Sequence, residues 1–249
     1  MQPNRSTGFR RVRIGLGVVA LIVAVGVAVL VATADETQVE QVDVGEYMAP
    51  IAAAALGTPV EEVEIHEYQG ERLGSVDDFR ENSIKGVQYV DEATYTLVLD
   101  GLVDQPTSWS YPELLEMEHL AKLVTIHCVE GWSVKALWEG IPLARLLEQA
   151  GPLEEANTVV FHAADGYTTS LPLDFILERN LIIADKINGI TLPPKNGFPF
   201  ELVAEEKWGY KWIKWIVRIE LTDDPSYRGF WESRGYSNKG DVDGPKFGD

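Results

Sequence analysis

The single cysteine of the chain, Cys128, is the side chain with the widest range of possible chemistry. It follows an apolar, β-branched run, residues 122–127, and precedes a loop that contains Gly131 and Trp132. The end of a strand is a common place for a reactive group, because the strand fixes the side chain while the loop leaves it accessible. One cysteine excludes an intrachain disulfide, a CxxC redox pair, a cysteine-rich zinc site and a c-type haem motif.

The sequence around Cys128 is compatible with four functions of this thiol. A lone cysteine is most often a buried structural residue. As a nucleophile it needs a base, and the candidates are His119, His127 and His162, although His127 points to the opposite face of the same strand. Zinc needs a ligand spacing that one cysteine with scattered histidines does not give. A soft metal held by one thiolate and completed by an organic cofactor is the fourth possibility.

A second group of residues suits an anion. Lys207, Lys211 and Lys214 alternate with aromatic residues around Gly209 in a strongly acidic chain. Such a patch could hold a phosphate, with the glycine letting backbone N–H groups approach it. The alternative is an edge strand whose lysines discourage association between sheets. The residues by themselves do not decide between the two.

Short strands and short helices must position these groups. Apolar or alternating runs predict strands over residues 94–99, 122–127, 158–162, 181–184 and 215–221, with turns at Asp165-Gly166 and Asn188-Gly189. Helices are predicted over residues 111–117, 142–151 and 173–178, from proline near the start and glycine just past the end. This mixture, without internal repeats, favours an α+β fold over a regular parallel α/β fold.

The first 34 of the 249 residues have the composition of a membrane segment. Residues 1–13 are a basic n-region, and residues 14–34 form a run of 21 residues without charge, which at about 1.5 Å per residue is long enough to span a bilayer. We expect a transmembrane anchor there. A cleaved signal is the alternative, because Ala32-Thr33-Ala34 also fits a cleavage site. The arginines before the run place the N-terminus in the cytoplasm and the rest of the chain outside.

The remaining residues divide into an acidic lead-in, a folded domain and a tail. Residues 35–80 are acidic and poor in aromatics, which indicates a weakly structured stalk with an Ala-rich patch at residues 51–56. Residues 81–236 carry the dense patterning of a domain, and residues 237–249 are a C-terminal tail. Residues 35–249 hold 17 basic and 39 acidic side chains, a net charge of −22. Such a field repels nucleic-acid phosphates, which excludes a nucleic-acid partner.

A series of short motifs begins at the cysteine and continues nearly to the C-terminus. The first is Thr125-Ile126-His127-Cys128-Val129-Glu130-Gly131-Trp132-Ser133, followed by Trp138-Glu139-Gly140-Ile141-Pro142-Leu143. The others, in order, are Asp165-Gly166-Tyr167, Asn188-Gly189, Leu192-Pro193, Asn196-Gly197 with Pro199, Gly209-Tyr210-Lys211 with Ile213-Lys214-Trp215, and Gly229 to Tyr236. Together they resemble the molybdenum-cysteine domain of the sulfite oxidase superfamily, in its small bacterial and archaeal members. The resemblance extends from about Asn82 to Tyr236.

The resemblance implies a sulfite-oxidase-type α+β domain, with mixed sheets and short helices, that buries molybdopterin. Cys128 would be the thiolate ligand of the molybdenum, with tungsten as the alternative metal, in agreement with the preference of soft metals for thiolate. Trp132 and Tyr167 would line the mouth of the metal site as catalytic residues. The residues implied to bind the cofactor are Asn82, with Ser83 as the alternative at that position, Cys128, Ala163, Asn196, Tyr210, Lys211, Trp212 and Lys214.

One position departs from the family pattern. Where relatives read Pro-Leu-Arg, this chain has Pro199-Phe200-Glu201. An acid beside a phosphate repels it, so either Lys211 and Lys214 carry the phosphate or the cofactor's tail differs.

The resemblance further implies an extracytoplasmic oxidoreductase that transfers an oxygen atom or electrons. A small S-oxide, N-oxide or sulfite is the expected substrate. The chain has no haem, flavin or iron–sulfur motif, so a separate membrane redox partner, haem or quinone-linked, is expected. We expect a monomer, because little chain follows the domain. The alternative is a non-catalytic cofactor-binding or electron-relay module of the same fold.

Overall fold

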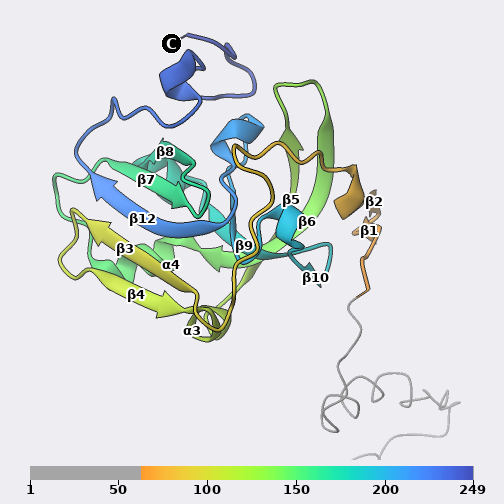
Figure 1. Ribbon diagram of the computed structural model, residues 1–249, viewed down its shortest axis with the longest axis horizontal. Helices are drawn as coiled ribbons and strands as arrows, with labels where there is room; N and C mark the ends of the chain where they lie inside the picture. Colours follow the sequence, from red (N-terminus) through yellow and green to blue (C-terminus); the bar gives the residue numbers. More distant parts are fainter. Residues whose placement is uncertain (1–62, 249) are drawn as a thin grey trace, which may run out of the picture. The chain divides into compact units, whose positions relative to one another are not determined.

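The computed structural model describes residues 63–248 (Figure 1). The predicted anchor at residues 14–34, and the predicted stalk as far as residue 62, lie outside the described residues. Within the described residues, no helix combines the length and the hydropathy needed to cross a bilayer. The predicted α+β class is confirmed, since mixed sheets are combined with a few short helices.

The first of two five-stranded sheets has the strand order β4-β3-β12-β7-β8. Its strands are Thr107–Ser110, Thr96–Gly101, Ile216–Thr222, Thr158–Ala163 and Thr168–Pro172. Neighbours are antiparallel except for the parallel pair of β12 and β3. Alternation along β3 buries Leu97 and Leu99 completely and leaves Val98 half-buried, which is the period-2 pattern of a sheet with one face in the core.

The second sheet carries the cysteine loop. Its order is β10-β9-β6-β5, with β11 paired to β9, and the strands are Ile190–Thr191, Ile182–Ile187, Ser133–Pro142, Leu120–His127 and Glu201–Val203. β5 and β6 form a hairpin whose tight turn is residues 128–132. The Cys128 N–H donates to the Trp132 carbonyl at 2.9 Å, and Gly131 supplies the left-handed backbone, at φ 91°, that the turn requires.

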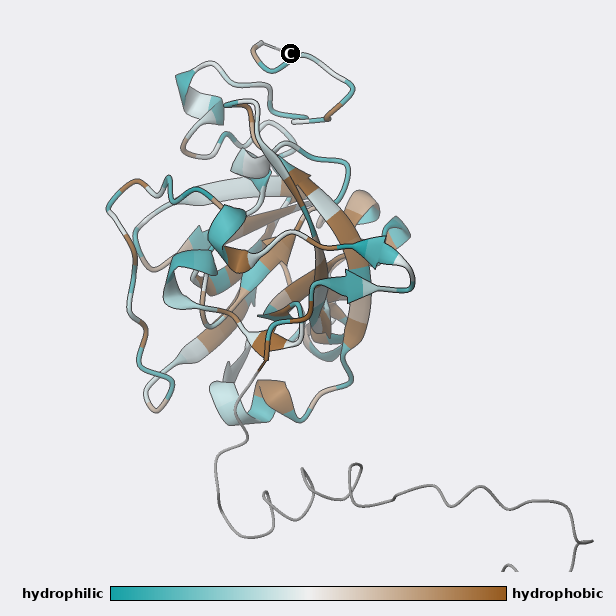
Figure 2. Cartoon of the chain, turned by 90° about the vertical axis from the view of Figure 1, so that its right-hand side faces the viewer, coloured by the Kyte–Doolittle hydropathy of each residue, from teal (hydrophilic) through white to brown (hydrophobic). Residues whose placement is uncertain are grey.

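Short helices close the ends of the sheets. α3, α4 and α5 span Tyr111–Leu115, Leu143–Ala150 and Leu173–Glu178, which confirms the three predicted helices. α4 ends at Gly151 in the left-handed conformation, as its sequence predicts. Four 3-10 turns, η1 (Val76–Asp78), η2 (Pro194–Asn196), η3 (Gly209–Lys211) and η4 (Glu232–Arg234), lie in the connections. Figure 2 shows hydrophobic residues concentrated along the strands, hydrophilic ones mainly on the loops, and both kinds on the helices.

Both ends of the described part differ from the predicted domain bounds of 81–236. Within the predicted stalk, residues 63–80 carry the hairpin of β1 (Glu67–Tyr68) and β2 (Glu71–Arg72), and the Glu64 carboxylate accepts from the Asn188 side chain at 2.9 Å. Within the predicted tail, the Trp208 N–H donates to the Gly240 carbonyl at 2.7 Å and the Val242 N–H to the Glu206 carbonyl at 3.0 Å. Both segments therefore pack on the domain.

Candidate active site

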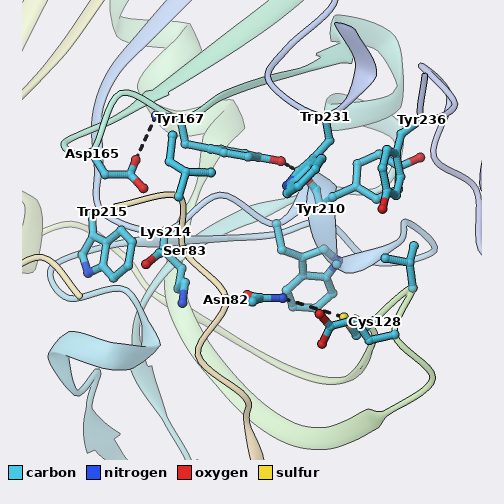
Figure 3. Close-up of a pocket in the computed structure, with 15 residues that line it drawn as sticks. Asn82, Ser83, Cys128, Asp165, Tyr167, Tyr210, Lys214, Trp215, Trp231 and Tyr236 are labelled. Atoms are coloured by element: carbon cyan, nitrogen blue, oxygen red, sulfur yellow. Dashed lines mark hydrogen bonds between the residues drawn. The ribbon is translucent and has the colours of Figure 1, made fainter. Parts of the chain in front are cut away.

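A cavity of about 210 Å³ lies where the cysteine loop faces η3 and the C-terminal part of the chain. It is lined by Asn82, Ser83, Ile84, Cys128, Val129, Glu130, Asp165, Tyr167, Gly209, Tyr210, Trp212, Lys214, Trp215, Trp231 and Tyr236 (Figure 3). A smaller cavity of about 40 Å³ shares Asn82, Gly209, Trp212 and Lys214 with it. The two are therefore adjacent compartments of one hollow, divided by these four residues.

The thiol of Cys128 borders the larger cavity. The residue is 4% exposed, and the Asn82 amide lies 3.8 Å from its Sγ, as Figure 3 shows. Burial raises the pKa of the Cys128 thiol, opposed chiefly by the backbone N–H of Glu130 and more weakly by the charges of Arg80 and Lys246. The free thiol is therefore protonated at neutral pH, and a coordinated metal ion is the kind of partner that removes such a proton.

The candidate bases for a cysteine nucleophile lie elsewhere. His119 Nε2 is 3.1 Å from Asp185 Oδ1, and His162 Nε2 is 2.9 Å from Glu220 Oε2. Neither of them, nor His127, lines either cavity. Residues 63–248 also contain no cluster of three or more His, Cys, Asp or Glu side chains that could hold a metal ion. A metal at Cys128 would therefore need ligands from a bound cofactor.

Aromatic side chains form a large part of the wall of the larger cavity. They are Tyr167, Tyr210, Trp212, Trp215, Trp231 and Tyr236. The Tyr167 hydroxyl donates to the Tyr210 carbonyl at 2.5 Å, and burial, reinforced by the charge of Glu232, raises the pKa of this phenol well above its ordinary value. Tyr167 is therefore a neutral, fixed part of the wall.

The three lysines that suggested an anion site do not gather at one cavity. Lys207 pairs with Asp241, and Lys211 pairs with Glu232 at 2.6 Å, with both side chains of the second pair fully buried. Neither Lys207 nor Lys211 lines a cavity, because η3 directs the Lys211 side chain into the interior, where its ammonium also donates to the Ser170 carbonyl. Of the three, Lys214 alone faces the hollow, and it lines both compartments.

The smaller cavity has several polar and charged side chains in its walls. Asn196, Glu201 and Lys214 line it together with Arg80 and Lys195. Within the part of the chain that the structure describes, the buried Oδ1 atom of Asn196 has no hydrogen-bond partner, and the same is true of the buried Ser83 Oγ in the larger cavity. Buried polar atoms in folded proteins are normally paired, so these two point to a ligand that fills the hollow.

The other predicted site residues take different places. Trp132 lines the smaller cavity, with its Nε1 3.2 Å from the Glu130 carboxylate. Ala163 lines neither cavity; its carbonyl accepts from the Gly166 N–H at the start of the turn that carries Asp165 and Tyr167. Apart from Ala163 and Lys211, the structure brings the predicted residues together around the two compartments; they are Asn82, Cys128, Trp132, Tyr167, Asn196, Tyr210, Trp212 and Lys214.

Several lining residues were not predicted as site residues. Asp165 stands in the Asp-Gly turn, and Trp231 and Tyr236 stand in the last sequence motif, so in these cases the motif was visible and the role was not. Glu130 stands two positions after Cys128, but its sequence position does not show that it faces the cavity. Lys246 lines neither cavity, but its ammonium donates to the carbonyl of the lining residue Val129 at 3.1 Å, and it comes from the segment predicted as a tail.

Glu201 is a titratable group of the smaller cavity whose pKa is strongly shifted by burial. Burial raises its pKa to about 8, and Lys214 opposes the shift only partly. Between the ordinary glutamate value and pH 8, the folded protein therefore binds a proton that the unfolded chain releases. The free energy of unfolding must then fall as pH rises through this window.

In protein made without cofactor, we expect the free energy of unfolding of Glu201→Gln to depend less on pH than that of the wild type. One proton changes the free energy of unfolding by at most about 1.4 kcal/mol per pH unit, and the glutamine has no such proton. Urea unfolding at pH 5 and at pH 8 measures the effect, which should make the variant more stable than the wild type at pH 8. Equal losses in the two proteins between these pH values would show that Glu201 is ionised in the fold.

Comparisons with known proteins agree on one family. Residues 84–231 match the model of the oxidoreductase molybdopterin binding domain. The chain is 37% identical over 154 residues to the uncharacterized oxidoreductase YuiH of Bacillus subtilis, covering 61% of this chain and 77% of the relative. Among solved structures, the chain is similar to the sulfane dehydrogenase SoxCD of Paracoccus pantotrophus, with a TM-score of 0.56 and 20% sequence identity. The match covers 76% of this chain and 57% of the SoxCD chain, and it supports the fold.

Two other relatives carry names that state a substrate. The putative protein-methionine-sulfoxide reductase subunit YedZ1 of Azospira oryzae is 35% identical over 152 residues, and the protein-methionine-sulfoxide reductase catalytic subunit MsrP of Gluconobacter oxydans is 36% identical over 147 residues. The matches cover 61% and 52% of this chain, respectively. They span 57% of the first relative and 47% of the second.

Proposed function

Because this chain belongs to the family of oxidoreductases that bind molybdopterin, we propose that Cys128 holds the molybdenum of that cofactor. We further propose that small, neutral S-oxides are reduced in the cavity beside Cys128. The chain is a molybdopterin-dependent oxidoreductase of the sulfite oxidase superfamily. The observation that carries the proposal is the position of its only cysteine, on the wall of a hollow whose buried Asn196 and Ser83 oxygens have no hydrogen-bond partner among residues 63–248.

The donors around the hollow fit the cofactor. A thiolate suits a soft metal, and one is enough where the cofactor's own sulfur atoms complete the coordination. Asn82, Asn196 and Lys214 lie along the walls of the two compartments and offer the amide and ammonium groups that bind a polar ring system and a phosphate. When bound, the cofactor supplies a metal centre that exchanges two electrons together with an oxygen atom.

The charges of the larger cavity favour a neutral substrate. Its walls hold the carboxylates of Glu130 and Asp165 against the single ammonium of Lys214. An anion such as sulfite meets repulsion there, whereas a sulfoxide carries no net charge. The aromatic wall offers contacts that are favourable for sulfur and its methyl groups. Two relatives are named as methionine-sulfoxide reductase subunits, which agrees with this substrate class.

The reaction needs electrons from another protein. Reduction of an S-oxide consumes two electrons and two protons and yields a sulfide and water, and the sequence holds no haem, flavin or iron–sulfur motif to store electrons. We therefore place a separate membrane redox partner beside this chain. The names of two relatives, which call them subunits, support a divided enzyme.

We further place the domain outside the cytoplasmic membrane, anchored by residues 14–34. This rests on the uncharged run and the arginines that precede it. The full chain should remain with membranes after an alkaline carbonate wash, and its release into the supernatant would contradict the anchor.

Substrate choice is tested on the full chain, loaded with cofactor, with a reduced dye as electron donor. We expect reduction of methionine sulfoxide and dimethyl sulfoxide, with kcat/KM at least about tenfold above that for sulfite oxidation with an oxidised dye, which corresponds to about 1.4 kcal/mol of discrimination. Preferred sulfite oxidation would overturn the substrate assignment. Silence with sulfoxides, N-oxides and sulfite alike, from a fully loaded protein, would favour the electron-relay alternative.

A further inference from the structure

The smaller cavity contains a buried carboxyl without a hydrogen-bond partner among the described residues. Glu201 is 4% exposed and lies on β11, and the ammonium of Lys214 is the charge that acts on it. Asn196, 3% exposed, lines the same compartment with its own unpartnered Oδ1. Two nearly buried polar side chains without partners in one cavity form a site built for a ligand.

Gly197 packs against the side-chain stems of both Glu201 and Lys214. Gly197 has a φ of 106°, and a Cβ atom on it would lie 3.0 Å from the Glu201 Cβ and 3.1 Å from the Lys214 Cγ. A side chain at this position would therefore push the two residues apart. Gly197 lets Glu201 and Lys214 approach the ligand from neighbouring positions.

The other charges around the compartment are positive. Arg80, Lys195 and Lys214 line it, and Glu201 is its one acid. Lys195 pairs with Asp77, and Lys214 lies 3.4 Å from Glu81, so both lysines also have partners toward solvent. This composition suits an oxyanion, provided that Glu201 does not carry a negative charge of its own.

We propose that Glu201 binds in its uncharged form and donates a hydrogen bond to an oxygen of a phosphate that Lys214 holds in the smaller cavity. This inference rests on the proposed function, because it assigns the phosphate to the molybdopterin cofactor. A protonated carboxyl turns a repelling group into a donor. Glu201, which stands where relatives have an arginine, would then bind the same phosphate in a different way.

Binding of this kind takes up a proton at high pH. The pKa of Glu201 is already raised to about 8 by burial, and a neighbouring phosphate raises it further. The charged groups that line the compartment together with Glu201 are Lys214, Lys195 and Arg80. Above pH 8 the carboxyl must therefore be reprotonated for the phosphate to bind, and affinity falls about tenfold per pH unit.

The test uses the full chain purified with its cofactor and follows pterin release by fluorescence between pH 6.5 and 9.5. Release from the wild type should accelerate about tenfold per pH unit above pH 8. Glu201→Gln, which offers an amide donor at every pH, should show no such acceleration.

Glu201→Met, which keeps the volume of the side chain but donates no hydrogen bond, should release pterin at least about tenfold faster than the wild type at pH 7. Glu206→Gln, the same change at an exposed residue of the same segment, should behave as the wild type.

A second arm separates the cofactor's phosphate from free phosphate. Protein made in a host that lacks the cofactor should bind inorganic phosphate in calorimetry about tenfold or more tightly at pH 7 than at pH 9, whereas loaded protein should bind none. Equal phosphate binding by loaded protein would overturn the assignment to the cofactor. Full loading with the same pH dependence in Glu201→Gln as in the wild type would overturn the role of Glu201 and leave the proposed function standing. Absence of pterin and metal from the wild type would instead defeat the proposed function.

Discussion

Cys128→Ala should abolish turnover while leaving the protein folded. Loss of an outer partner of a metal ligand typically costs 10 to 100-fold in affinity or activity, and loss of the protein's own ligand should cost more, at least about a thousand-fold in kcat/KM. The side chain is small, so the free energy of unfolding should change by only about 1 kcal/mol. Dye-linked activity and urea unfolding measure the two effects.

Asn82→Ala is the matched control for this loss. Its amide touches the Cys128 Sγ at 3.8 Å, so it should lose about 10 to 100-fold in activity and should not reach the loss of the cysteine variant. A Cys128→Ala protein that keeps more than a tenth of the wild-type activity would show that the metal is held without this thiolate.

The second large effect concerns stability, at the buried ion pair of Lys211 and Glu232. Both side chains have zero exposure, and their 2.6 Å contact is supported by a hydrogen bond from Thr169 to the same carboxylate oxygen. Lys211→Met keeps the length of the stem but leaves Glu232 charged and buried. Removal of one partner from a buried pair costs about 3 to 5 kcal/mol, and we expect a loss of this size in urea unfolding.

Two comparisons separate this effect from a general loss of charge. Lys135→Met removes a lysine from an exposed pair with Glu71 and should cost less than about 1 kcal/mol. In the background of Glu232→Gln, the Lys211→Met change should cost much less than it does alone, because no buried charge is left behind. If Lys211→Met unfolds as the wild type does but loses the cofactor, Lys211 binds the phosphate, as the resemblance implied.

The lysines show where prediction from the sequence ends. Three lysines among aromatics in an acidic chain suggested an anion site, and Lys214 of this segment does line the hollow, but the sequence does not show that η3 turns Lys211 inward. Its partner, Glu232, lies 21 positions away in the last motif. An ion pair of this kind depends on tertiary structure, and no local pattern encodes it.

The strands were also predicted only in part. The runs over residues 94–99, 122–127, 158–162, 181–184 and 215–221 were predicted as strands, and each lies within or overlaps an observed one, because apolar and alternating patterns are local signals. β6, the longest strand, was missed. Its burial is nearly continuous rather than alternating, and Gly140 and Pro142 suggest a loop. The structure explains the glycine, since a Cβ there would meet the Ile183 carbonyl at 2.1 Å.

The site was predictable to the extent that motifs mark it. Cys128, Asn196, Tyr210, Trp212 and Lys214 stand in motifs and line the hollow. Ala163 stands beside a motif and supports it only through its backbone. Lys246 reaches the cysteine loop from a segment with no motif, because a glycine-rich and polar stretch gives no local sign of the contacts that hold it.

The measurement that tests the central claim most directly is the molybdenum and pterin content of the full chain, purified from a cofactor-competent host beside Cys128→Ala. Metal analysis and pterin fluorescence after denaturation should give about one metal atom and about one pterin for each wild-type chain, since one thiolate binds one such centre. The variant should hold at most about a tenth of the metal. A wild-type protein without metal or pterin, or a Cys128→Ala protein with full metal content, would contradict a molybdenum centre held by Cys128.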